Sequence, residues 1–160
     1  MNSYRTHTCS ELRAANIGKP TTLIGWVDSV RDHGGVIFID LRDRSGITQV
    51  VFHPEVNQDV AKASQQLRSE DMIQISGTVA ARLKTDTVDT TNADLPTGEI
   101  EVSADTLNVI NKADVLPFQL DRALSNEDLR LKYRFLDLRR PSMVLSLIHI
   151  SEPTRQAEIS

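Results

Sequence analysis

The chain has 160 residues, of which 39% are hydrophobic and 25% charged, the composition of an ordinary globular protein. Its formal net charge of −4 disfavours a groove that neutralises many phosphates of duplex nucleic acid, because such binders are usually basic. The single cysteine, Cys9, excludes an internal disulfide and a cysteine-based zinc site. There is no apolar run of membrane-spanning length and no apolar signal segment, so we expect a cytoplasmic protein without a membrane partner.

The first third of the chain predicts a short helix followed by three strands. The helix is expected over 9–17, where Gly18 provides a C-terminal stop. The β-rich runs, which are separated by turns, are 21–32, 36–43 and 47–53. Gly25 lies inside the first run and indicates a bulge or a sharp bend. Three such runs in succession predict a meander.

After the third run, the spacing of apolar residues changes from two to three or four, which predicts an amphipathic helix over 55–70. The residues that define this spacing are Val56, Val60, Ala63 and Leu67. Two further strands are expected, one over 72–83 and one beginning at Gly98. The polar, threonine-rich segment 84–97 between them is predicted to be an exposed loop.

Three strands, a helix and two strands match the element order of the OB-fold, a mainly β, five-stranded Greek-key barrel with a helix between strands 3 and 4. The barrel assigns residues 1–110 to one domain. Residues 111–143 are predicted to be a hinge linker with a C-terminal linker helix over 125–141, where Ser125 and Asp128 form a capping pattern.

The residues of the second predicted strand alternate between aliphatic and other types. The strand therefore has one face for the core and one outer face that is available for binding. The aliphatic set should face the core, which leaves Phe38 on the outside. On the same outer face we expect Arg31, Gln49 and Glu101, from the first, third and fifth strands. A ring, a guanidinium, an amide and a carboxylate are the groups that hold splayed single-stranded bases.

Each of these residues also has an ordinary interpretation. Phe38 is then part of a partner interface, and Gln49 and Glu101 are solvated polar residues. Arg31 is then in a weak surface ion pair with Asp32. Only the convergence of the four residues on one predicted face favours base recognition.

The sequence contains no recognisable set of catalytic residues. The run GKPT at 18–21 lacks the upstream glycine of a phosphate-binding loop, and there is no G-x-S-x-G or H-E-x-x-H motif. The four histidines lack metal-ligand spacing, and His33 lies in a glycine turn. We therefore expect no catalytic residue, no metal ligand and no cofactor within this chain.

Five segments, in the right order from about Arg5 to Met143, resemble the N-terminal part of bacterial-type aspartyl-tRNA synthetase. They are RTHTCSELRAANIGK, LIGWVDSVRDHGGVIFIDLRDRSGITQVVFHPE, ISGTV, TGEIEV and RLKYRFLDLRRP. The resemblance implies an anticodon-binding OB domain and a hinge. In the parent enzyme, a homodimer, a class II domain follows, which uses ATP and magnesium to attach aspartate to tRNA. The chain is therefore expected to be a fragment that binds tRNA and is inactive alone.

The resemblance also implies roles for individual residues. The residue matching the family's anticodon-stacking phenylalanine is Phe38, and Arg31 and Gln49 match residues that contact anticodon bases. Glu101 matches the glutamate that faces the first anticodon base. His33 resembles forms that also accept the tRNA of asparagine, so tRNA-Asp is the expected partner and tRNA-Asn a second.

Ser29 and Val30 stand where many members of that family carry arginine, which implies fewer contacts to the RNA backbone and weaker binding. The alternatives are the related asparaginyl or lysyl synthetases, a stand-alone single-strand-binding OB protein and, more distantly, a glycan-binding barrel. The predicted helix over 125–141 and the lack of a basic groove argue against the stand-alone protein.

The last segment of the chain, 144–160, departs from the family. Its run LSLIHISEPTR, at 145–155, resembles the translation of a sequencing adapter, so the segment is predicted to be an artefactual tail. A divergent native tail is the alternative. Amplifying genomic DNA across codon 144 distinguishes the two.

Overall fold

The computed structural model describes residues 4–84, 87–118, 127–140 and 143. The chain divides into two units, Met1–Ala113 and Asp114–Ser160. Among the described residues, all the strands lie in the first unit, and two short helices lie in the second. In the parts of the chain that are described, no helix is long and apolar enough to cross a membrane.

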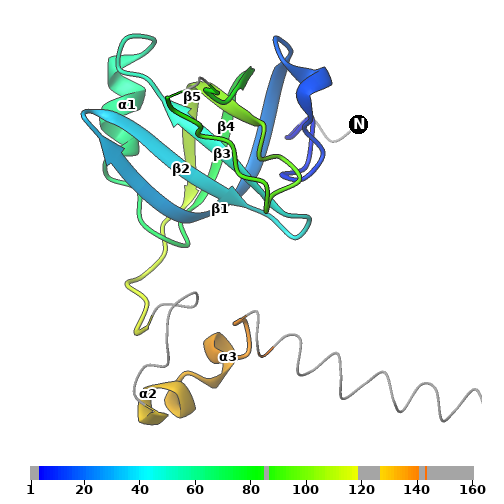
Figure 1. Cartoon of the computed structure of the whole chain (residues 1–160). Helices are drawn as coiled ribbons and strands as arrows, with labels where there is room; N and C mark the ends of the chain where they lie inside the picture. The colour runs from blue at the N-terminus through cyan, green and yellow to red at the C-terminus, as the bar shows by residue number, and fades with distance from the viewer. Residues whose placement is uncertain (1–3, 85–86, 119–126, 141–142, 144–160) are drawn as a thin grey trace, which may run out of the picture. The chain divides into compact units, whose positions relative to one another are not determined.

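The strands of the first unit close into a barrel (Figure 1). They are β1 (Pro20–His33), β2 (Val36–Arg42), β3 (Ile47–Phe52), β4 (Met72–Ala81) and β5 (Ile100–Asn111). Around the barrel the order is β1-β2-β3-β5-β4, in which β3 and β5 are parallel and the other pairs antiparallel. With the helix α1 (Gln58–Ser64) between β3 and β4, this confirms the predicted OB-fold.

β1 closes the barrel because it pairs with two strands. Its first half pairs with β4 and its second half with β2, and the two halves meet at Trp26. The predicted bulge is not at Gly25, since the shift in register lies between Val27 and Ser29. A Cβ atom on Gly25 would clash with the backbone oxygen of Arg42. Glycine is therefore needed there for the close approach of β1 and β2.

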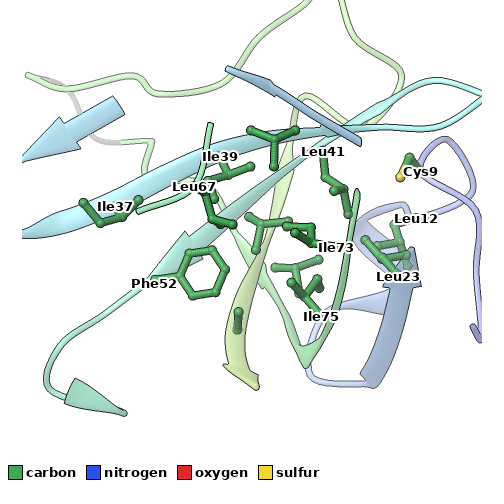
Figure 2. Close-up of a cluster of buried hydrophobic side chains, with 14 of the residues drawn as sticks. Cys9, Leu12, Leu23, Ile37, Ile39, Leu41, Phe52, Leu67, Ile73 and Ile75 are labelled. Carbon is green, nitrogen blue, oxygen red and sulfur yellow. The ribbon is translucent and has the colours of Figure 1, made fainter. Parts of the chain in front are cut away.

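The alternation predicted for β2 is present. Ile37, Ile39 and Leu41 are each at most 1% exposed, and Phe38 and Asp40 are half-buried on the other face. Figure 2 shows the aliphatic side chains of β2 within the buried cluster. Other labelled members of that cluster are Leu23, Phe52, Leu67, Ile73 and Ile75. The core of the barrel thus fixes which side of β2 faces outward.

The predicted helix over 55–70 is too long. α1 begins at Gln58 because the side chain of Asn57 accepts hydrogen bonds from the backbone N–H groups of Asp59 and Val60. The buried face also differs from the predicted one, which included Val56, Val60, Ala63 and Leu67. Leu67 is buried and Val60 half-buried, as predicted, but Val56 and Ala63 are exposed, while Ala61 and Ser64 are buried.

Replacing Asn57 with alanine should lower the free energy of unfolding by about 0.5–2 kcal/mol, the usual loss for an N-cap. Its side-chain oxygen accepts from Asp59 N at 3.1 Å and from Val60 N at 3.2 Å. Urea unfolding measures the change. Asn57→Asp keeps an oxygen acceptor and should recover most of the stability. An unchanged midpoint for Asn57→Ala would contradict the cap.

The predicted helix over 9–17 is wrong except for one turn of 3-10 helix, Ala14–Asn16. The backbone of Cys9 is instead hydrogen-bonded to side chains of β3 and of the turn between β2 and β3. Its N–H donates to Asp43 Oδ2 at 2.9 Å, and its carbonyl accepts a hydrogen bond from Thr48 Oγ1. These tertiary contacts use the backbone N–H and carbonyl groups of Cys9, which a helix would need for its own hydrogen bonds. Cys9 is also fully buried.

In the second unit, the predicted linker helix is divided into α2 (Glu127–Lys132) and α3 (Arg134–Asp137), with a break at Tyr133. The buried carboxylate of Asp137 lies 3.0 Å from Arg130 Nε and 3.0 Å from Arg140 Nε. These pairs join α2, α3 and the residues that follow. Parts of the prediction, namely the cap at Ser125 and the tail over 144–160, lie outside the described residues.

Candidate nucleic-acid interface

Phe38 lies near the middle of the outer face of three adjacent strands. Its Cα is the partner of Arg31 on β1 and of Val51 on β3. The ring is half-buried, on the side of β2 opposite the core. The predicted placement of Phe38 on the outer face is therefore what the structure shows, with its ring partly covered by neighbours.

His33 lies beside Phe38, at the end of β1. The two rings meet edge to face, with their centroids 5.5 Å apart and an angle of 74° between the planes. The turn that follows is held by Asp32, whose Oδ1 accepts a hydrogen bond from the N–H of Gly35 at 2.9 Å. The β1–β2 turn therefore brings the two rings together.

The remaining predicted residues form a hydrogen-bonded chain across the strands. Arg31 Nη2 donates to Asp40 Oδ1 at 2.9 Å and lies 3.4 Å from Gln49 Oε1. Gln49 Nε2 donates to Glu101 Oε2 at 2.8 Å. We call these four residues, from β1, β2, β3 and β5, the polar chain. It joins the three polar residues predicted from the sequence and adds Asp40.

Gln49 is less accessible than the sequence suggested. It is only 6% exposed, whereas the ordinary interpretation of its position was a solvated side chain. The reason is that its amide lies between the side chains of Arg31 and Glu101 and bonds to both. The amide is therefore held with its oxygen toward Arg31 and its nitrogen toward Glu101.

Arg82, which directly follows β4, was missed by the sequence analysis. It is 7% exposed, and its Nε and Nη1 donate to the carbonyl oxygens of Ile100 and Thr90 at 3.0 and 3.3 Å. Its Nη2 has no hydrogen-bonding partner in the structure as far as it is described. Burial lowers the pKa of Arg82, and the charges of Asp40 and Glu101 oppose that shift.

A signal for Arg82 was present in the sequence. Side chains alternate along β4, and Arg82 lies two residues beyond Ala80, which pairs with Glu101. The same parity therefore places Arg82 on the face of Glu101.

The formal charges of the polar chain and of the neighbouring Arg82 sum to zero. Arg31 and Arg82 are positive, and Asp40 and Glu101 are negative, so the cluster carries no net formal charge. Such a cluster is poorly suited to a row of phosphates, which needs an excess of cations. It offers donors and acceptors beside an aromatic ring, which suits the uncharged edges of nucleobases.

The described residues contain no group of three or more histidine, cysteine, aspartate or glutamate side chains that could hold a metal ion.

Comparison with known proteins agrees with this picture. Residues 21–110 match the family model tRNA_anti-codon, described as an OB-fold nucleic acid binding domain. The chain is 50% identical over 144 residues to an "Aspartate--tRNA(Asp/Asn) ligase" of Methylacidiphilum infernorum, covering 90% of this chain and 23% of that protein. It is 52% identical over 144 residues to the protein of the same name from Salinibacter ruber, covering 87% of this chain and 22% of that protein.

Among solved structures, the chain is similar to asparaginyl-tRNA synthetase from Pyrococcus horikoshii, with a TM-score of 0.69 and 28% identity. That match covers 84% of this chain and 29% of the synthetase. The chain thus spans about a quarter of the length of these two ligases and this synthetase. Because the family model covers more than half of its residues, the chain belongs to the tRNA_anti-codon family of OB-fold nucleic acid binding domains.

Proposed function

We propose that this chain is the anticodon-binding part of an aspartate–tRNA ligase, and that it recognises tRNA-Asp and, as a second partner, tRNA-Asn. The observation that carries the proposal is the fixed amide of Gln49, held between Arg31 and Glu101 on the face that also bears Phe38. The names of the similar ligases, which include both tRNAs, support the choice of partner.

In this proposal Phe38 is the platform on which an anticodon base stacks, and the polar chain reads base edges. The Glu101 carboxylate has about four acceptor positions, of which Gln49 occupies one. The others can accept the N–H groups on the pairing edge of guanine, the first base of the GUC anticodon. The Arg31 side chain, which is 46% exposed, supplies donors for base carbonyl groups.

His33 is proposed to lie close to the anticodon, because its ring contacts that of Phe38. A substitution that displaces the His33 ring should therefore also change the position of the Phe38 ring. This is also the residue through which we propose that tRNA-Asn is accepted.

The chemistry of the ligase is assigned to the rest of a longer, homodimeric cytoplasmic enzyme. This chain binds and orients the tRNA, and we propose that it is inactive in aminoacylation by itself.

The proposal is tested by titrating the 160-residue chain with anticodon stem-loops that bear GUC, GUU and UUU. GUC should bind most tightly, and each base change should weaken binding by about 1–3 kcal/mol, the usual discrimination of a bidentate contact. Fluorescence anisotropy measures the dissociation constants. Equal binding of the three stem-loops would instead identify a general binder of single-stranded nucleic acid.

A further inference from the structure

Asp40 belongs to the polar chain but was not among the residues predicted to contact RNA. It lies on β2, with Ser29 on β1 and Gln49 on β3 as its Cα partners. Its Oδ2 accepts the hydroxyl proton of Ser29 at 2.7 Å, and its Oδ1 accepts from Arg31 Nη2 at 2.9 Å. Both carboxylate oxygens are therefore engaged by β1.

The contact with Asp40 restrains a side chain that would otherwise be mobile. The Arg31 side chain is 46% exposed and has many rotamers, while that of Asp40 is 23% exposed and short. The nitrogen of Arg31 that bonds Asp40 is the same one that lies 3.4 Å from Gln49 Oε1. The position of Asp40 therefore influences where the guanidinium lies and which way the amide of Gln49 points.

We propose that Asp40 is a positioning residue for base recognition, which acts by holding Arg31 and, through Arg31, the amide of Gln49. This inference rests on the proposed function and deepens it by adding a determinant of specificity.

A purely structural role predicts a different outcome. An ion pair that is as accessible as Asp40–Arg31 contributes little to the stability of a fold. If Asp40 acts by positioning, its loss changes the preference for one base sequence over another. If Asp40 only supports the barrel, its loss changes the unfolding midpoint and leaves that preference intact.

The test compares Asp40→Asn with Ser29→Ala in the full chain. Asp40→Asn removes the charge at nearly constant shape, and Ser29→Ala removes the other bond to the same carboxylate while leaving Arg31 paired. For Asp40→Asn, the ratio of the dissociation constants for UUU and GUC stem-loops should fall by about fivefold or more, the loss of one charge-assisted hydrogen bond. Ser29→Ala should keep the ratio, and Asp40→Glu should restore part of it.

A double mutant tests whether Asp40 acts through Arg31. In an Arg31→Ala background, Asp40→Asn should cause no further fall in the ratio. An unchanged ratio for Asp40→Asn alone, an equal loss for both stem-loops, or loss of the fold would overturn the inference. If the unmutated chain does not discriminate between the stem-loops, the proposed function fails first and this inference with it.

Discussion

Replacing Phe38 with alanine is expected to weaken binding of the GUC stem-loop by about 1–3 kcal/mol, the usual contribution of one stacked base. This corresponds to a factor of about 5–150 in the dissociation constant. The reason is that the ring lies on the outer face of β2, on the side away from the core. Anisotropy titrations of the full chain measure the loss.

Two observations check this result. Phe38→Tyr keeps an aromatic face and should retain most of the binding. Urea unfolding of Phe38→Ala should show a barrel that remains folded, because the ring is absent from the buried cluster. A large loss of stability, or unchanged binding, would mean that Phe38 is a structural residue.

Replacing the next residue, Ile39, with alanine should lower the stability of the barrel and leave RNA affinity almost unchanged. This is the reverse of the result expected for Phe38→Ala. Ile39 is fully buried within the barrel core, so its truncation should lower the free energy of unfolding by about 2–5 kcal/mol. Thermal or urea unfolding measures the change. Where the variant is still folded, its affinity for the stem-loop should be close to that of the unmutated chain.

The matched control for this core position is Ile39→Val, which removes one methylene and should cost about 0.5–1.5 kcal/mol. A graded series from isoleucine to valine to alanine is the expected signature of a packed site. If Ile39→Ala left stability unchanged and weakened binding, the assignment of the two faces of β2 would be reversed.

The sequence was sufficient to predict the fold because two local signals agreed. The alternation in β2 identified its core face, and the order of strands and helix identified the barrel. The failures over 9–17 and 55–70 have a common physical cause. In both segments, side chains take up backbone groups, through Asp43 and Thr48 at Cys9 and through Asn57 at α1. Helical spacing contains no information about such contacts.

For the candidate site, the sequence predicted which residues share a face, and the roles of Arg31, His33, Phe38, Gln49 and Glu101 remain predictions. Two features required the structure. The contact between Gln49 and Glu101 joins residues 52 positions apart, and its geometry depends on how β3 and β5 pair. The burial of Arg82 depends on Ile100 and Thr90, whose carbonyl groups hold its guanidinium.

The alternation along β2 limits where residues can be inserted into this domain or deleted from it. Because neighbouring residues face opposite sides, inserting or deleting one residue at the start of β2 would turn Phe38 toward the core and Ile39 toward the outer face. Such a change would thus disrupt both the outer face that bears Phe38 and the packing of the core. Additional residues leave this alternation unchanged where the chain is outside the sheet, as it is between β4 and β5.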